Sequence, residues 1–197
     1  MGAPLKDRDV RSAAHRQLLR HARSCPDTLV LDELGVAHGA CRMDIAVING
    51  HIRGYEIKAE ADTLDRLPRQ VAAYGDIVDY ATLIVDQRHL AAALPLLPCW
   101  WGILVATRSS TGDVRFRRIR AERYNWSADS MTLARLLWRP EAAALLRARG
   151  HDEKSLRANR ATLYARLITE MPRRELSAAV RQTLKARTGW RDHARPL

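Results

Sequence analysis

The sequence predicts a mixed α/β fold, and three observations support that prediction. Short apolar runs rich in β-branched residues have the length of strands, longer runs carry apolar residues at helical spacing, and the two kinds alternate through the first part of the chain. With 197 residues, of which 47% are hydrophobic, the chain is large enough to bury a core. We expect a central sheet flanked by helices.

The N-terminal elements are expected to be one helix followed by three strands. Residues 11–23 are helix-forming, with Leu18 and Leu19 on one apolar side, and Pro26 helps to end the helix. Asn49-Gly50 is a strong hairpin signal between the second and third strands. The strands are expected over residues 28–34, 42–48 and 51–58.

The middle of the chain is expected to alternate helices with strands. A helix over residues 63–76 is entered from Asp62 as its N-cap and contains Pro68, which can kink it. The elements that follow are expected to be a strand at 80–85, a helix at 88–97, a strand at 101–107 and an edge strand at 114–119.

The pattern changes after Asn125, where only helices are expected. They cover residues 132–138, 140–149, 153–171 and 173–187. We therefore predict two domains, a core over residues 1–127 and a basic, all-helical segment over residues 128–197.

The net charge of +11 is concentrated near the C-terminus. Lys and Arg outnumber Asp and Glu by 14 to 6 in residues 139–197, against 11 to 10 in residues 1–75. Such a block favours a polyanionic partner, since Lys and Arg on phosphates release counterions. A compositional bias toward arginine, which supplies 29 of the 33 basic residues, is the alternative explanation.

Cysteine usage and hydropathy limit the classes of protein to which the chain can belong. The three cysteines are widely spaced, which indicates neither a disulfide framework nor a structural zinc site. No apolar run has the length of a membrane span, and the charged N-terminus does not resemble a signal peptide. We expect a cytoplasmic protein with no membrane partner, and the sequence leaves a homodimer open.

Asp44, Glu56 and Lys58 form the strongest candidate for a reaction centre. Glu56 and Lys58 lie two residues apart in the third strand, so they share one face while Ile57 points to the other. Hydrolysis of a phosphodiester needs oxygen ligands for Mg²⁺, which Asp44 and Glu56 can supply. It also needs positive charge beside the attacked phosphate, which Lys58 can supply.

A metal shared by the two carboxylates requires a particular hairpin register. With a two-residue turn at Asn49-Gly50, paired residue numbers would sum to 99, and Asp44 would lie on the opposite face from Glu56. We therefore predict a three-residue loop with a glycine bulge, or a bulge elsewhere, so that paired numbers sum to an even value.

These residues resemble the motif of the PD-(D/E)XK nuclease superfamily, a strand aspartate followed by Glu-x-Lys. Met43 stands where the proline of the motif's name is expected. Gln70 and Tyr74, which share a helical face, resemble the Gln-x-x-x-Tyr of RecB-like members. Glu33 resembles the extra acidic ligand of Holliday-junction-resolvase-like members. The likeness covers about residues 11–107, and the stretch from Gly54 to Gln70 also resembles small bacterial and phage proteins of that superfamily.

The resemblance implies a restriction endonuclease-like core of helix, three antiparallel strands, helix and strand, here with a C-terminal helical segment. It implies a Mg²⁺- or Mn²⁺-dependent nuclease that hydrolyses phosphodiester bonds, with DNA favoured over RNA as the substrate. The implied metal ligands are Asp44, Glu56, Glu33 and the carbonyl of Ile57. The other implied roles are Lys58 for the attacking water, Gln70 and Tyr74 for orienting Lys58 and the phosphate, and Arg66 and Arg69 for nucleic-acid contacts.

Each assignment has a structural alternative. Glu33 can be a capping or surface carboxylate, Gln70 and Tyr74 a half-buried polar pair, and Arg66 a surface residue. Four aromatic residues can stack on bases, although aromatic residues near apolar strands more often belong to the core; they are Trp100, Trp101, Tyr124 and Trp126. The main alternative function is a nuclease-like fold that acts as a nucleic-acid-binding or regulatory module with little or no cleavage; a helical adaptor with an incidental acidic cluster is another.

Overall fold

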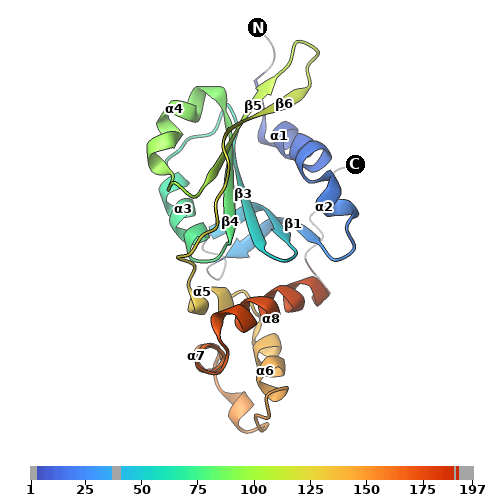
Figure 1. Cartoon of the computed structure of the whole chain (residues 1–197), viewed down its shortest axis with the longest axis vertical. Coiled ribbons are helices and arrows are strands. Elements are labelled where there is room, and N and C mark those ends of the chain that lie inside the picture. Colours follow the sequence, from blue (N-terminus) through green and yellow to red (C-terminus); the bar gives the residue numbers. More distant parts are fainter. Residues whose placement is uncertain (1–3, 37–40, 189, 191–197) are drawn as a thin grey trace.

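A six-stranded open sheet with the order β1-β2-β3-β4-β5-β6 forms the centre of the molecule (Figure 1). The computed structural model describes residues 4–36, 41–188 and 190. The strands are β1 (Leu29–Val36), β2 (Cys41–Ile48), β3 (Ile52–Lys58), β4 (Tyr80–Asp86), β5 (Gly102–Arg108) and β6 (Val114–Arg120). The first three are antiparallel, β3, β4 and β5 are parallel, and β6 is antiparallel to β5. The predicted mixed α/β class is confirmed.

The β2–β3 hairpin has the even register that a shared site requires. Ile48 pairs with Ile52 and Ala46 with Gly54, so that paired numbers sum to 100. Three residues, Asn49, Gly50 and His51, form the loop; the Asn49 side chain accepts the backbone N–H of His51 at 3.1 Å. Gly50 is not among the described residues with positive φ, so the loop closes without the predicted glycine bulge. The register prediction is confirmed.

One face of the sheet is covered by the N-terminal helical segment. It consists of α1 (Asp7–Ala13), the π-helical turn η1 (Ala14–Leu18) and α2 (Arg20–Ser24). The predicted single helix over residues 11–23 therefore begins earlier and is interrupted by a wider turn. Val10 and Ala13 of α1 pack in one apolar cluster with Ile57 of β3, which confirms that Ile57 faces away from Glu56 and Lys58.

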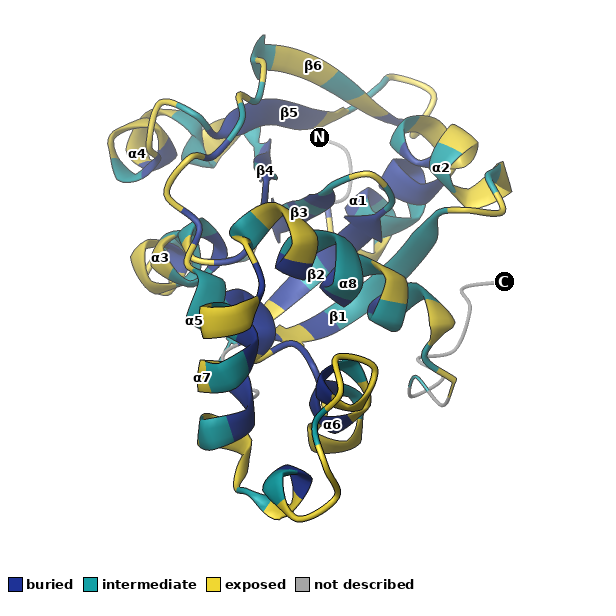
Figure 2. Ribbon diagram, turned by 60° about the horizontal axis from the view of Figure 1, so that its bottom comes forward, coloured by how far each residue is buried: buried dark blue, intermediate teal, exposed yellow. Residues whose placement is uncertain are grey.

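The other face is covered by α3 (Leu67–Gly75) and by a short segment of 3₁₀ turns and helix between β4 and β5, as the burial pattern in Figure 2 shows. That segment comprises η3 (Gln87–His89), α4 (Leu90–Ala93) and η4 (Leu94–Leu96) instead of one helix over residues 88–97. Pro95 lies in the first turn of η4. Because proline has no N–H to donate, it interrupts the expected α-helix here.

Helix α3 begins later than the sequence predicts. It starts at Leu67, and Pro68 lies in its first turn, where a missing backbone N–H costs nothing. The predicted N-cap Asp62 does not cap this helix; its carboxylate accepts the N–H of Ala59 at 2.7 Å and so holds the turn after β3.

The remaining helices pack together below one end of the sheet (Figure 1). They are α5 (Ser130–Ala134), α6 (Arg139–Arg147), the 3₁₀ turn η5 (Ser155–Arg157), α7 (Arg160–Glu170) and α8 (Arg173–Ala186). The predicted helix over residues 153–171 is broken because Asn159 caps α7, its side chain accepting the N–H of Thr162 at 3.0 Å.

A single apolar cluster joins the sheet to these helices. It contains Leu83 and Val85 of β4 together with Leu163 of α7 and Leu176 of α8. Side chains on both sides of residue 127 thus share a core, and the division into two domains stays a prediction. Within the described part of the chain, no helix has the length and apolar character needed to cross a membrane.

Candidate functional site

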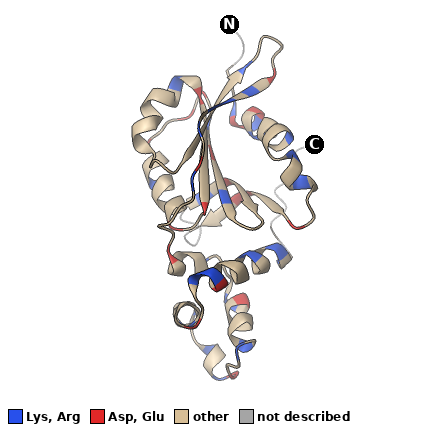
Figure 3. Ribbon diagram, viewed as in Figure 1, with Lys and Arg blue, Asp and Glu red and all other residues tan. Residues whose placement is uncertain are grey.

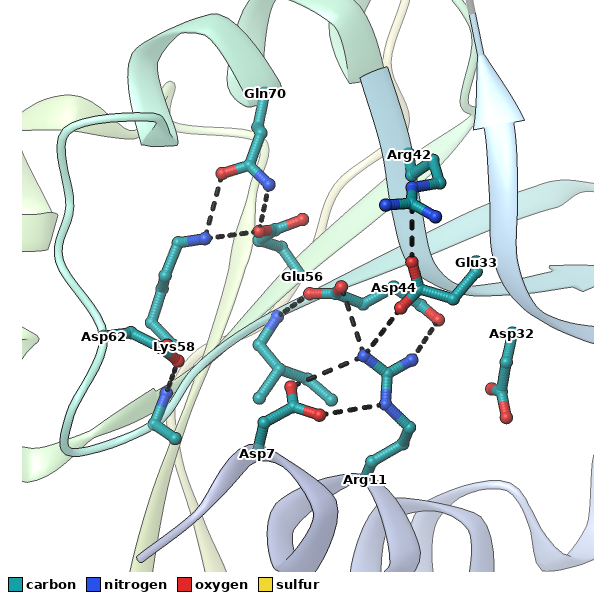
Figure 4. Close-up of polar contacts among 12 residues, drawn as sticks. Asp7, Arg11, Asp32, Glu33, Arg42, Asp44, Glu56, Lys58, Asp62 and Gln70 are labelled. Atoms are coloured by element: carbon teal, nitrogen blue, oxygen red, sulfur yellow. Dashed lines mark hydrogen bonds and ion pairs between the residues drawn. The ribbon is translucent and has the colours of Figure 1, made fainter. Parts of the chain in front are cut away.

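A cleft of ≈ 520 Å³ opens where β3 ends, between α1, β1, β2 and the segment that leads into α3. Eight of the nine predicted site residues line it: Glu33, Asp44, Glu56, Ile57, Lys58, Arg66, Arg69 and Gln70. The cleft also includes residues that the sequence analysis did not select, namely Asp7, Arg11, Cys41, Arg42, Asp62 and Thr63. Figure 4 shows several of these polar side chains pointing toward one another.

Glu56 and Lys58 form a buried ion pair at the floor of the cleft. The Lys58 Nζ lies 2.6 Å from Glu56 Oε1, and the two residues are only 5% and 1% exposed, respectively. The Gln70 carbonyl oxygen accepts a second hydrogen bond from Nζ at 2.9 Å, and its amide donates to Glu56 Oε1. Because Gln70 contacts both partners, it fixes the ammonium in one orientation.

Tyr74 lies behind the cleft and does not line it. Its hydroxyl donates to Glu56 Oε2 at 2.6 Å and accepts the backbone N–H of Asp44 at 3.2 Å. Burial, together with the charge of Glu56, raises the pKa of Tyr74 well above its ordinary value, so the hydroxyl stays protonated as a donor. A Cβ at Gly54 would come within 2.7 Å of the Met43 sulfur and 3.2 Å of the tyrosine ring, so glycine makes room for both side chains. Tyr74 therefore positions the two carboxylate-bearing strands.

Asp44 is the acidic residue most strongly affected by its surroundings. Its Oδ2 accepts the backbone N–H of Ile57 at 2.8 Å, and its Oδ1 accepts from the Arg11 guanidinium at 3.2 Å. Burial, and next the charge of Glu56, raise the pKa of Asp44 to about 7 despite these hydrogen bonds. Two carboxylates that disfavour each other's charge in a cleft create a place where a cation is stabilised.

Arg11 holds the carboxylates of α1, β1 and β2 together. Its guanidinium lies 3.0 Å from Glu33 and 3.2 Å from Asp44, and its Nε lies 3.2 Å from Asp7 (Figure 4). Burial alone would lower the pKa of Arg11, but the three carboxylates outweigh it and raise that pKa above its usual range. The only signal in the sequence was the helical i,i+4 spacing of Asp7 and Arg11.

Glu33 adopts a left-handed backbone conformation, with φ of 58°. It interrupts the ladder, since Asp32 pairs with Ile45 and Leu34 with Met43 while Glu33 itself is skipped. For a residue other than glycine this conformation costs on the order of 1–2 kcal/mol. The kink turns Glu33 toward the cleft, whereas the neighbouring Asp32 contacts His15 at 2.8 Å.

The oxygen donors of the cleft suit a hard divalent cation. Mg²⁺ binds one or two carboxylates and keeps several waters. Asp44 and Glu56 could supply such a pair next to the backbone of Ile57, but Glu56 would then exchange for the ion hydrogen bonds that it now accepts from Lys58, Gln70 and Tyr74. Among the described residues, no three side chains of His, Cys, Asp or Glu are grouped closely enough to hold a metal. The guanidinium of Arg11 lies between Glu33 and Asp44, so whether Glu33 is a ligand stays a prediction.

Comparisons with known proteins place the chain in a family. The family model described as bacteriophage P4 protein cII matches residues 8–194. Protein cII of Enterobacteria phage P4 is 25% identical over 123 residues, which cover 62% of this chain and 46% of that protein, so the chain spans less than half the length of this curated relative. A solved structure, the SPO1766 protein of unknown function from Silicibacter pomeroyi, matches with a TM-score of 0.41 and 23% identity over 74% of this chain and 93% of that one.

Proposed function

The chain belongs to the bacteriophage P4 protein cII family, and we propose that it is a metal-dependent nuclease of the PD-(D/E)XK type, built on a restriction endonuclease-like core. It would hydrolyse phosphodiester bonds, in DNA rather than RNA. The observation that carries the proposal is the buried Glu56–Lys58 pair, held by Gln70 beside Asp44 in one cleft.

The way in which Lys58 is held supports a catalytic role for it. Burying a charged lysine costs free energy because the ammonium loses its hydration. The buried position of Lys58 therefore cannot be explained by a contribution to solubility. Glu56 and Gln70 fix its Nζ at 2.6 and 2.9 Å. An ammonium that is oriented before the substrate arrives can stabilise charge on a phosphate without reorganisation.

Asp44 and Glu56 are the proposed ligands of Mg²⁺ or Mn²⁺. A bound ion of this kind activates a water molecule and neutralises charge on the phosphate. Tyr74 holds the two ligands relative to each other, because its hydroxyl contacts Glu56 and the backbone of Asp44.

The reaction is a hydrolysis in which a water oxygen forms a bond to phosphorus while the bond to the leaving oxygen breaks. The water loses a proton and the leaving oxygen gains one. Lys58 is proposed to position the water through its ammonium group, and the proton that the water loses passes to solvent. Gln70 keeps the Lys58 ammonium aimed at the cleft. The exposed side chains of Arg66 and Arg69 at the rim are proposed to contact the phosphate backbone on either side.

One observation favours the alternative, a nucleic-acid-binding module with little cleavage. Arg11 already gives Glu33 and Asp44 a shared cationic partner, so part of the negative charge of the cleft is offset without an added ion. Under this alternative, Arg11 is a permanent structural cation and the carboxylates do not bind a metal.

The test is cleavage of labelled single- and double-stranded DNA and RNA with Mg²⁺ or Mn²⁺. Wild-type protein is expected to cut DNA only when the ion is present. Asp44→Asn and Lys58→Met should each reduce the rate by at least about a hundredfold. Asp65→Asn, which changes an exposed carboxylate outside the cleft, serves as the matched control and should cut normally. Salt-sensitive binding without cleavage by wild type would favour the alternative.

A further inference from the structure

A second pocket lies at the opposite end of β3, next to the hairpin loop and α8. It measures ≈ 690 Å³, and its walls include His51, Asp79, Tyr124, Trp126, Arg174 and Arg181. His51 directly precedes β3 and Lys58 ends it, and a strand rises about 3.3 Å per residue. The pocket therefore lies roughly 20 Å along the strand from the proposed reaction centre.

The aromatic side of this pocket exposes the face of a tryptophan. Trp126 is 85% exposed, the most among the described large apolar residues. Its ring leans on that of Tyr124, with centroids 4.5 Å apart, and Tyr124 in turn meets His51 and Tyr80 edge to face. Trp126 thus contacts the ring of Tyr124 and leaves most of its own ring accessible, so that a flat ligand can stack on it.

The opposite side of the pocket is basic. Arg173 and Arg181 lie eight residues apart on α8 with Ser177 midway, so they form a stripe along one face of the helix. Arg181 donates to Ser177 Oγ at 2.5 Å, and Arg174 is exposed. The basic residues along α8 are visible in Figure 3. Arg173 donates to the backbone carbonyl of Ala128. Arg174 and Arg181 are therefore the guanidinium groups that can contact an anion in this pocket.

Asp79 determines which part of a ligand can lie at the base of the pocket. Its Oδ2 accepts the backbone N–H of Ile52 at 2.8 Å and lies 3.7 Å from His51 Nδ1. A buried carboxylate repels a phosphate but can accept a hydrogen bond from an N–H group of a base, whether an amino group or the ring N–H of thymine. An aromatic face with an acceptor on one side and arginines on the other therefore matches a nucleotide, with its base inward and its phosphates toward α8.

We propose that this pocket binds single-stranded nucleic acid by stacking a base on Trp126 and pairing the adjacent phosphates with Arg174 and Arg181. In a duplex the base faces are occupied by neighbouring bases, so stacking on a side chain requires an unpaired strand. The inference rests on the proposed function for the identity of the substrate and deepens it, since it places a second contact for the same strand away from the cleft.

Binding without cleavage tests the proposal separately from nuclease activity. The probe is a fluorescent oligodeoxythymidine of about twelve nucleotides, titrated in EDTA at several salt concentrations. Wild type and Asp65→Asn, which changes an exposed carboxylate outside both the cleft and this pocket, should bind equally. Trp126→Ala should weaken binding by about 5- to 150-fold, and Trp126→Phe should restore most of it. Trp138→Ala, at an exposed tryptophan outside the pocket, should have no effect.

The arginines are tested by the salt dependence of the same binding. Each phosphate contact contributes about 0.7 to the slope of log K against log salt for a single strand. Arg174→Ala/Arg181→Ala should therefore reduce that slope by about 1.4, whereas Arg157→Ala/Arg160→Ala, with the same loss of charge outside the pocket, should leave it unchanged.

Circular dichroism shows whether the variants are folded. The proposal is overturned if folded Trp126→Ala binds like wild type, or if a duplex of equal length binds as tightly as the single strand. If oligodeoxythymidine binds as expected while no substrate is ever cut, the pocket stands and the nuclease proposal fails.

Discussion

The charged groups beside the two ends of β3 differ in how far they are exposed to solvent. At its C-terminal end, Glu56 and Lys58 are buried, paired with each other and held by a third residue. At its N-terminal end, Trp126 and Arg174 are exposed around a supporting aromatic cluster. Fixed, desolvated charges suit a reaction whose geometry is set in advance, whereas exposed aromatic and basic groups suit a flexible ligand. The same strand thus connects the proposed reaction centre with the pocket that is proposed to bind single-stranded nucleic acid.

Lys58→Met should give the largest effect on stability. It leaves the Glu56 carboxylate buried without its cation, and breaking such a pair typically costs about 3–5 kcal/mol. Urea unfolding measures the difference. Arg174→Ala at the other end should change the free energy of unfolding by less than about 0.5 kcal/mol. Glu56→Gln/Lys58→Met, which removes both charges, should recover much of the loss; a double variant as unstable as Lys58→Met would show that the ion pair is not the cause.

Titration of Asp44 in the cleft should make the free energy of unfolding depend on pH. The pKa of Asp44 is about 7 in the folded protein and near its ordinary value of 3.8 in the unfolded chain, so between these pH values the folded state holds a proton that the unfolded chain has lost. The stability that this proton provides is present below pH 3.8 and is lost as the pH rises through 7, an effect of roughly 4 kcal/mol.

Asp44→Asn removes the titrating group and checks that sign. The difference in unfolding free energy between Asp44→Asn and wild type should shift in favour of the variant as the pH increases from 4 to 8. Trp126→Ala, measured in parallel, should show a constant difference from wild type. A flat difference for Asp44→Asn would mean that Asp44 has an ordinary pKa.

Glu33→Gly tests the backbone strain in β1, where we expect a smaller effect than for Lys58 or Asp44. Glycine adopts the left-handed conformation without strain, so this variant should be about 1 kcal/mol more stable than Glu33→Ala, which loses the same carboxylate but keeps the Cβ. Both lose the contact with Arg11, which therefore cancels. Equal stabilities in urea unfolding would indicate that the kink is not strained.

The sequence predicted the parts of the site that depend on one strand pair. Because side chains alternate along strands, the need to bring Asp44 and Glu56 to one face was enough to predict the three-residue loop before β3. The spacing of Gln70 and Tyr74 likewise predicted their shared helical face. In each case local periodicity determines the neighbours.

Contacts between distant elements could not be predicted in the same way. Arg11 reaches Asp44 only because α1 packs against the sheet, and no local pattern encodes that packing. The left-handed Glu33 is an exception to strand geometry that other contacts impose. The starts of α3 and α7, which the sequence analysis placed too early, did have a local signal. Pro68 is a good first-turn residue for α3, and Asn159 is a good N-cap for α7.

The central claim is that Asp44 and Glu56 hold a divalent cation beside Lys58, and calorimetric titration of Mn²⁺ at pH 8 tests it most directly. The account predicts one ion per chain for wild type and Asp65→Asn, and binding at least about tenfold weaker for Asp44→Asn and Glu56→Gln, since each loses one of two ligands. No binding by folded wild type, or equal binding by Asp44→Asn, would contradict the claim.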